Sequence, residues 1–138
     1  MVKEAKIQFQ NFVVSESHIV FREPGQYKIS VNFNPEGFIL PNLNQFHLKL
    51  QILVKDEENK FDIDLKSISI FTYDPEADIE DLKTHFFVTN APAITFPYLR
   101  SYISALTSLS GMPTLTLPTL NLTGLTDVLR DNITVIED

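Results

Sequence analysis

The stretch that decides the fold is Ala91-Pro-Ala-Ile-Thr-Phe-Pro-Tyr-Leu-Arg100. A proline in the first turn of a helix costs nothing, because its missing N–H would have no intrahelical partner there. The sequence therefore predicts that Pro97 is the first residue of a helix. Gly111 and Pro113 end that helix, since glycine favours a left-handed cap and proline cannot extend the hydrogen-bond ladder. One apolar face follows from the helical spacing of Phe96, Leu99, Ile103 and Leu106.

The residues before this stretch alternate between apolar and polar, which is the pattern of half-buried strands. Three such runs begin at Tyr27, Phe46 and Phe61. An earlier strand spans residues 7–14 and resumes at 19–21. The sequence thus predicts four antiparallel strands ahead of the helix.

The connections between these runs contain turn residues. Residues 23–25 and 56–59 predict tight turns, and the latter joins two alternating runs as a hairpin. Residues 34–44 contain two prolines, a glycine and several asparagines, and predict a longer loop. The apolar phase of the third run shifts near residues 66–67, which predicts a β-bulge there.

The second half of the chain favours helices. Ile79, Leu82 and Phe86 predict a short helix, residues 115–122 an extended leucine-rich segment, and a last short helix begins near Thr123. We therefore expect one α+β domain over residues 1–138, with a four-stranded antiparallel sheet followed by two helices.

Composition narrows the classes of partner. The 138 residues carry a net charge of −7, which disfavours nucleic acid and anionic membrane surfaces. There is no cysteine, so no disulfide or thiolate metal site is possible. No stretch predicts a signal peptide or a membrane-spanning helix, and we expect a cytoplasmic protein without membrane insertion.

Nothing in the sequence predicts an enzyme. His18, His47 and His85 fall in separate elements, and the four glycines form no phosphate-binding loop. We therefore predict no catalytic residue, no metal and no cofactor.

Two segments resemble a known family. Residues 91–100 are similar to the P-x-I-x-F-P-Y-x-R signature of the export chaperone SecB, and residues 111–122 to its G-x-x-P-x-L-x-L-x-P-x-N-F segment. The second match has one residue fewer before Pro113, a proline shifted by one place, and Leu122 where the family has phenylalanine. The resemblance implies the SecB-like fold and a homo-oligomer, either a dimer or a tetramer. The exposed first strand and the serines on the helix, Ser101, Ser104 and Ser108, are the features that would form its contacts.

The resemblance also implies a groove that binds unfolded polypeptides without ATP. The alternative for each of its residues is plain packing in the core. A stretch of three apolar residues in the predicted loop corresponds to the family's crossover loop, and the other residues lie on the third run, the helix and the leucine-rich segment. The client-binding residues implied are Phe38, Ile39, Leu40, Phe61, Ile63, Tyr98, Leu120 and Leu122.

Coupling to secretion is the point at which the sequence departs from the family. SecB docks to the SecA translocation motor through acidic side chains on its sheet. His18 and Arg22 stand where the first strand would carry two of them, whereas Asp62 and Asp64 on the third alternating run supply carboxylates for partner docking. The resemblance thus implies a polypeptide-binding chaperone with impaired SecA docking. The alternative is a SecB-like adaptor that binds one dedicated protein, for example a toxin–antitoxin component.

Overall fold

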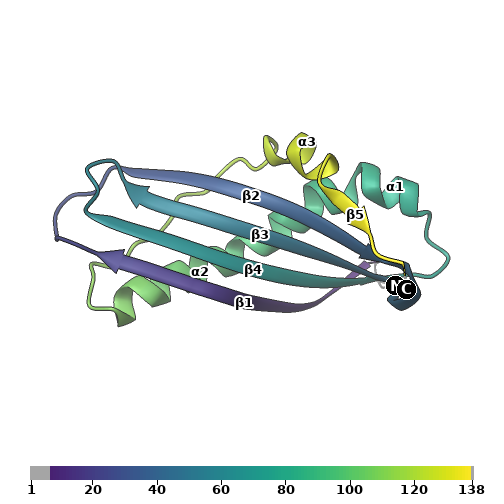
Figure 1. Ribbon diagram of the computed structural model, residues 1–138, viewed down its shortest axis with the longest axis horizontal. Helices are drawn as coiled ribbons and strands as arrows, with labels where there is room; N and C mark the ends of the chain where they lie inside the picture. The colour runs from purple at the N-terminus through teal and green to yellow at the C-terminus, as the bar shows by residue number, and fades with distance from the viewer. Residues whose placement is uncertain (1–6, 138) are drawn as a thin grey trace, which may run out of the picture.

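The structure is a computed structural model that describes residues 7–137. Four long strands come first along the chain, followed by helices and a short fifth strand (Figure 1). The elements are β1 (Ile7–Phe21), β2 (Ile29–Leu40), the 3-10 turn η1 (Pro41–Leu43), β3 (Gln45–Asp56), β4 (Phe61–Tyr73), α1 (Ile79–Thr84), the π-helical turn η2 (Phe86–Asn90), α2 (Ala91–Leu109), α3 (Leu125–Arg130) and β5 (Ile133–Val135).

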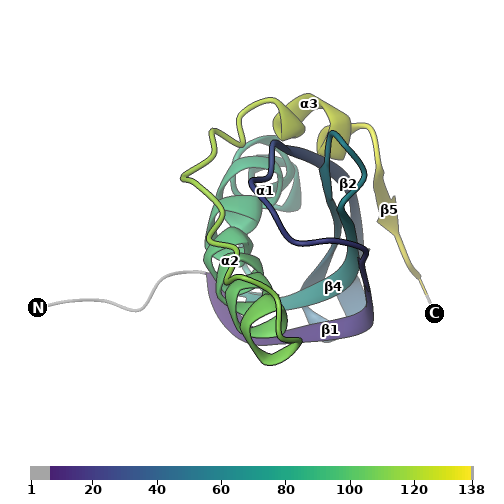
Figure 2. The same ribbon diagram turned by 90° about the vertical axis from the view of Figure 1, so that its left-hand side faces the viewer.

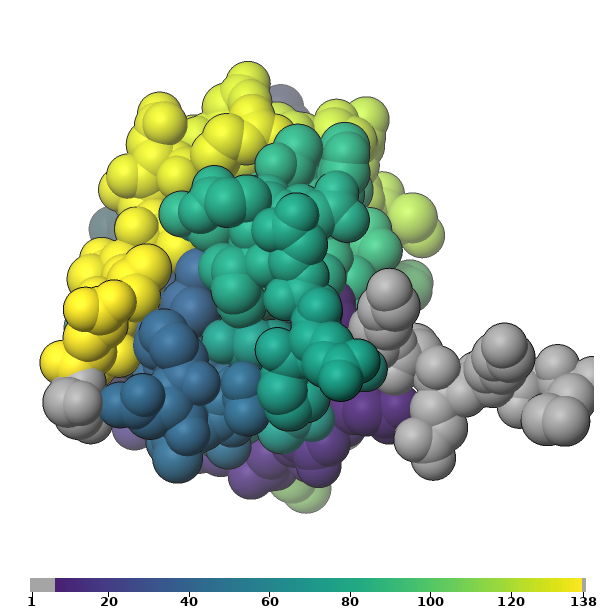
Figure 3. Space-filling model, turned by 90° about the vertical axis from the view of Figure 1, so that its right-hand side faces the viewer, coloured from purple at the N-terminus to yellow at the C-terminus, as the bar shows by residue number. Residues whose placement is uncertain are grey.

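All five strands form one sheet in the order β1-β4-β3-β2-β5. The first four are antiparallel to their neighbours, as the alternating sequence predicts, and β5 pairs in parallel with β2. The sequence does not predict β5, because three residues at one edge of a sheet leave almost no periodic pattern. Figure 3 shows this C-terminal segment, in yellow, beside the blue surface of the β2–β3 connection.

Helix α2 covers one face of the sheet, and the opposite face carries no helix (Figures 1 and 2). The core lies between them and consists of alternate residues of β3 and β4 packed on α2 and η2. Phe46 of β3 stacks on Phe87 of η2 with ring centroids 4.0 Å apart. Within residues 7–137 no helix has the length and apolar character that crossing a membrane requires.

The predicted bulge at residues 66–67 is wrong, because β4 pairs with β3 without interruption across this point. Two serines continue the buried phase of the strand: Ser67 donates from Oγ to the Leu50 carbonyl at 2.8 Å, and Ser69 accepts from Thr95 at 2.7 Å. Buried hydroxyls with hydrogen-bond partners occupy core positions at little cost. The register shifts lie instead in β1, between Phe9 and Asn11 and between Val14 and Glu16.

The predicted loop at residues 34–44 is also wrong over most of its length, since β2 runs on to Leu40. Pro35 and Gly37 occupy inward-facing strand positions. A Cβ atom on Gly37 would lie 2.9 Å from the Phe46 ring and 3.1 Å from Ile133, so the glycine makes room for both. Proline is tolerated on an outer strand when its nitrogen points away from the ladder.

Helix α2 begins at Ala91, so the prediction that Pro97 is its first residue is wrong. Pro92 takes the first-turn position, where a proline costs nothing. Pro97 lies inside the helix and cannot donate the usual hydrogen bond to the Ala93 carbonyl. The predicted end of the helix is confirmed: α2 stops at Leu109, and Gly111 has a positive φ of 80°.

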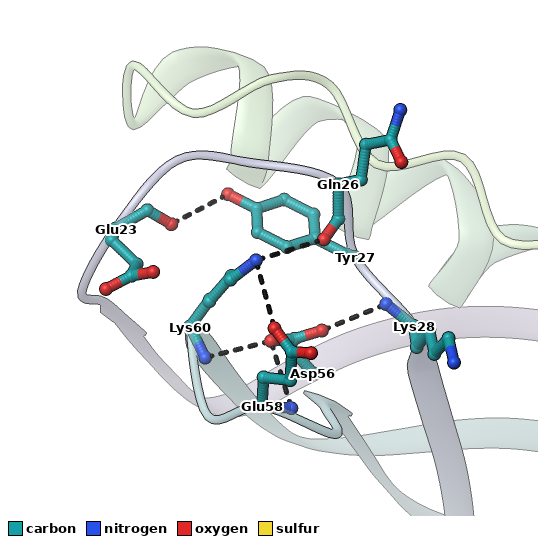
Figure 4. Close-up of polar contacts among 7 residues, drawn as sticks. All are labelled: Glu23, Gln26, Tyr27, Lys28, Asp56, Glu58 and Lys60. Atoms are coloured by element: carbon teal, nitrogen blue, oxygen red, sulfur yellow. Dashed lines mark hydrogen bonds and ion pairs between the residues drawn. The ribbon is translucent and has the colours of Figure 1, made fainter.

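The β3–β4 hairpin is closed by one buried carboxylate (Figure 4). Asp56 is 3% exposed and accepts hydrogen bonds from the backbone N–H groups of Lys28, Glu58 and Lys60 at 2.9–3.2 Å. Burial alone would raise the pKa of Asp56, but these donors outweigh it and lower the pKa below the usual value. The Lys60 ammonium lies 3.2 Å from Glu58 and 3.4 Å from the Gln26 carbonyl. The loop after β1 is thereby attached to the hairpin.

Candidate functional site

An apolar groove runs along the outer side of α2. It has a volume of about 340 Å³ and lies between the helix and the extended segment that follows it. We call it the α2 groove; it is lined by Thr89, Ala93, Phe96, Pro97, Arg100, Thr119, Leu120, Asn121, Leu122 and Thr123.

Side chains of α2 hold the extended segment in place. Arg100 donates from Nε to the Leu117 carbonyl at 2.6 Å, and Ser104 donates to the Leu115 carbonyl at 3.1 Å. Thr107 accepts from the Leu115 N–H at 2.9 Å. These bonds hold the extended segment in the way that backbone pairing holds a strand in a sheet. The last of them is at Leu117. Ser104 therefore acts within the chain, whereas Ser101 and Ser108 are exposed.

The proline inside α2 leaves one backbone carbonyl beside this groove without its usual helical hydrogen bond. The exposed residues Ala93 and Pro97 both line it, and the Ala93 carbonyl has no helical N–H to accept from. Arg100 is the one charged residue of the lining, so the groove combines apolar walls with a single cation. Nothing in this arrangement resembles an acid–base pair or a nucleophile.

A second groove lies on the other side of the extended segment. Its volume is about 240 Å³, and we call it the β2 groove, lined by Val31, Phe33, Leu120, Asn121, Leu122, Gly124 and Leu125. Leu120 and Leu122 are shared by the two grooves and are half-buried. Phe33 packs edge-on against Phe96, with centroids 6.0 Å apart, beneath them. Leu120 and Leu122 thus form a ridge between two apolar grooves, which we call the leucine ridge.

The structure separates the predicted client-binding residues into three groups. Leu120 and Leu122 lie together on this ridge. Tyr98 is 44% exposed but lies across α2 from the ridge, where its ring packs on Phe9 and Phe12 of β1. The remaining residues belong to strands: Ile39, Phe61 and Ile63 are buried in the core, and Phe38 and Leu40 are half-buried on β2.

Sequence reasoning missed most of the groove lining. The sequence predicts a half-buried strand at Val31 and Phe33 and a helix start at Pro97, and it indicates no surface role for these residues or for Ala93. The signal that was available is the proline within a helical pattern, which predicts an irregular and partly exposed turn.

The two predicted partner-docking carboxylates lie on β4 and are already engaged. Asp62 forms an ion pair with Arg22 at 2.6 Å, and Asp64 accepts from Gln51 at 2.9 Å, opposite His18 in the strand register. Farther along the open face of the sheet, burial and the neighbouring Lys49 lower the pKa of His47. Among residues 7–137 no cluster of three or more histidines and carboxylates could hold a metal ion.

An antiparallel sheet covered on one face by one long helix is the fold of a SecB-like protein. The family model described as preprotein translocase subunit SecB matches residues 7–128. The chain therefore belongs to the SecB family, a family of chaperones and not of enzymes.

One curated relative supports this assignment, and one solved structure shares the fold. The chain is 35% identical over 118 residues to the protein-export protein SecB of Buchnera aphidicola subsp. Schizaphis graminum, covering 84% of this chain and 75% of the relative. Its fold matches the SecB-like chaperone Rv1957 of Mycobacterium tuberculosis, solved with a ChAD peptide from the antitoxin HigA1, with a TM-score of 0.74 and 20% identity. That match covers 83% of this chain and 91% of the chaperone.

Proposed function

We propose that this chain is an ATP-independent holdase that binds apolar segments of unfolded polypeptides along the ridge of Leu120 and Leu122. The observation that carries the proposal is the pair of apolar grooves on either side of that ridge. An unfolded chain offers apolar side chains at short intervals, and burying them is favourable by roughly 25 cal/mol per Å² before ordering costs. No nucleotide is needed for such binding.

Charge supports the same function. A protein that keeps apolar surface accessible must avoid self-association, and a net charge of −7 opposes it. The single cation in the α2 groove, Arg100, is tied to the Leu117 carbonyl, so most of the lining remains free for apolar contact.

Suppression of aggregation tests this function. The protein at near-stoichiometric ratio should slow the light-scattering rise of reduced insulin B chain without ATP. Leu120→Ser with Leu122→Ser should abolish most of this effect. Leu109→Ser is the matched control, because Leu109 is 89% exposed and lies outside both grooves. Equal activity of the double variant and the wild type, or no activity over a wide concentration range, refutes the proposal.

A second candidate function is that of an adaptor for one dedicated protein. The structure of the mycobacterial SecB-like chaperone with an antitoxin peptide favours it, because a SecB-like fold binds a specific segment there. Capture experiments separate the two functions. Many unrelated unfolded proteins bound at similar strength indicate a holdase, and one stoichiometric partner indicates an adaptor.

We further propose that the chain does not dock to SecA in the family's usual way. Arg22 neutralises Asp62 at 2.6 Å, and His18 stands opposite Asp64. Loss of complementary charge mainly slows association. Titration against SecA at low salt should show binding weaker than micromolar. Submicromolar binding that is lost on Asp64→Arg contradicts this.

The assembly proposed is a homo-oligomer in which β1 takes part. This strand lies at one edge of the sheet and exposes Val13, Val20 and Phe21. Light scattering at tens of micromolar should give a dimer or tetramer, and a monomer would refute it.

A further inference from the structure

One long stretch of the chain contains no acidic residue. The chain carries 18 aspartates and glutamates in total, but residues 82–126 contain none, and we call them the acid-free stretch. Its side chains that carry charge at pH 7 are Lys83 and Arg100. Every residue that lines the α2 groove belongs to this stretch. The groove is therefore lined without any negative charge in a protein whose net charge is −7.

Arg100 is the arginine that lacks a carboxylate partner. Arg22 and Arg130 form ion pairs with nearby aspartates at 2.6 and 2.9 Å, whereas Arg100 forms none within residues 7–137. Its Nε donates to the Leu117 carbonyl at 2.6 Å, and its Nη1 and Nη2 donors bond to no described residue. A half-buried cation without a counter-ion is unfavourable, and a ligand that brings an anion removes this cost.

A polar hollow adjoins the α2 groove at Arg100. Its volume is about 410 Å³, and we call it the serine hollow, lined by Pro97, Arg100, Ser101, Ser104 and Thr116. Pro97 and Arg100 line both spaces, so the groove and the hollow meet at this arginine. The hydroxyls of Ser101 and Thr116 bond to no described residue and can donate to an anion. The junction thus offers a guanidinium and hydroxyl donors, and no carboxylate.

The α2 groove ends at the same arginine. Its lining residues on the helix side run from Thr89 to Arg100. Beyond Arg100, the bonds of Ser104 and Thr107 to Leu115 hold the extended segment directly on the helix. At 1.5 Å per helical residue the groove is about 16 Å long, which accommodates about five extended residues. A polypeptide that lies in the groove must therefore end, or turn away, at Arg100.

We infer that the α2 groove binds the C-terminus of a polypeptide, with the terminal carboxylate on Arg100 and the last apolar side chains in the groove. This rests on the proposed function and names the class of segment that binds. A carboxylate accepts two parallel N–H bonds from one guanidinium, and such charged pairs are about twice as strong as neutral hydrogen bonds. A chain end needs no exit beyond Arg100, whereas an internal aspartate or glutamate does.

The probe is a decapeptide with fluorescein at its N-terminus and the ending Leu-Ser-Leu-Ser-Leu. It is made with a free terminal carboxylate (the acid) and with a terminal amide. By fluorescence anisotropy, the acid should bind about tenfold more tightly than the amide, as expected for charged hydrogen bonds. The net charge of −7 by itself favours the amide, so a preference for the acid needs a local cation. Equal binding of the acid and the amide overturns the inference.

A second pair of peptides tests the position of the carboxylate. It has the same leucine ending followed by Gly-Ser-Gly-Ser-Gly, again as an acid and as an amide. These two should bind alike, because the carboxylate then lies far from the apolar side chains in the groove. An equal preference for the acid in the extended pair overturns the inference.

Variants test the arginine itself. Arg100→Met should remove the preference, so that both peptides bind as the amide does. Loss of the Leu117 contact alone would weaken both peptides equally and leave the ratio of their affinities unchanged, so this ratio reports anion binding. Lys83→Met is the matched control, because Lys83 is the other cation of the acid-free stretch and lines neither space. A preference that survives in Arg100→Met, or that Lys83→Met also removes, overturns the inference. Circular dichroism shows whether the variants are folded, and if Arg100→Met is not, the peptides and the wild type still decide.

A fatty acid shares this chemistry, because it too carries a carboxylate on an apolar chain. Octanoate is therefore added to the complex of the protein with the acid peptide. Displacement only at concentrations more than about tenfold above the Kd of the peptide supports a polypeptide C-terminus. Displacement at lower concentrations assigns the site to fatty acids and overturns the inference.

These results can be told apart from failure of the holdase proposal. A protein that suppresses aggregation but binds the acid and the amide alike is a holdase without selectivity for C-termini, and only the inference fails. A protein that binds no peptide and suppresses no aggregation refutes the proposed function instead.

Discussion

The turn between β3 and β4 and the leucine ridge both lie outside the paired strands of the sheet, but different contacts hold them. At the hairpin one buried carboxylate accepts three backbone N–H groups, and Lys60 joins it to the preceding loop. Along the ridge, the hydrogen bonds from α2 end at Leu117, and residues 118–120 make none to any described residue. The turn between β3 and β4 is fixed by polar contacts that join it to a distant segment. The ridge has only local hydrogen bonds, from the Leu125 N–H to the Leu122 carbonyl and from Thr123 to Asn121, and is otherwise held by apolar packing.

This difference matches the proposed function. A binding surface for varied segments must adjust, and regions with few hydrogen bonds and half-exposed contacts open at the lowest free-energy cost. The sheet behind it must stay rigid so that the grooves keep their shape. Three substitutions test this contrast, from the largest expected effect on stability to the smallest.

Phe46→Ala should lower the free energy of unfolding the most, because it removes an aromatic ring from the buried core behind the grooves. Phe46 is completely buried, stacks on Phe87 at 4.0 Å and fills the space that Gly37 leaves. We expect the free energy of unfolding to fall by about 3–5 kcal/mol. Urea unfolding measures it, with Phe38→Ala on the open face of the sheet as the control. A loss below about 1 kcal/mol would show that this core relaxes around the cavity.

The sequence predicted the strands of the sheet better than the ridge and its grooves. Period-two alternation identified β3 and the start of β4, because the buried residues at alternate positions from Phe46 to Val54 and from Phe61 to Leu65 are all apolar. It failed where polar or small residues take inward positions: Ser67 and Ser69 suggested a bulge, and Gly37 a loop. These residues can be buried because of contacts with residues distant in sequence: Ser67 bonds to Leu50, Ser69 bonds to Thr95, and Gly37 packs against Phe46. A local sequence pattern does not contain such contacts.

The candidate site was predictable only in part for the same reason. Leu120 and Leu122 stood out as a leucine stripe, but Val31 and Phe33 looked like ordinary strand residues. Their position at an open edge follows from the strand order, and β5 was not visible in the sequence. Tyr98 belongs to the family signature, yet its contacts with Phe9 and Phe12 place it near β1.

Asp56→Asn should have the second-largest effect, and its size should depend on pH. The folded pKa of Asp56 lies below its unfolded value, because three N–H donors favour the carboxylate despite burial. Its charge therefore stabilises the fold above the unfolded pKa, and this contribution is lost as the pH falls through the folded pKa. The Tm of the wild type should fall more steeply than that of Asp56→Asn below about pH 4.

The comparison is made by thermal unfolding from pH 7 to pH 2.5. Glu57→Gln, at an exposed position in the same turn, is the control for a general change of charge. Parallel Tm curves for the wild type and Asp56→Asn would mean that the carboxylate does not hold the hairpin in the way its contacts indicate.

Arg100→Met should have the smallest effect on stability and the most local one. The methionine keeps the apolar stem but loses the 2.6 Å bond from Nε to the Leu117 carbonyl, worth about 1–2 kcal/mol. Because this bond is the last one before the ridge, its loss should speed amide hydrogen exchange at residues 115–122 and leave residues 56–60 unchanged.

Arg100→Lys is the matched control for charge, since a lysine ammonium lacks the planar Nε donor. If the ridge adjusts to its ligand, Arg100→Met should still bind unfolded clients, with faster dissociation. Equal acceleration of exchange in the hairpin and the ridge would show that the two regions unfold together, and the contrast between them would not hold.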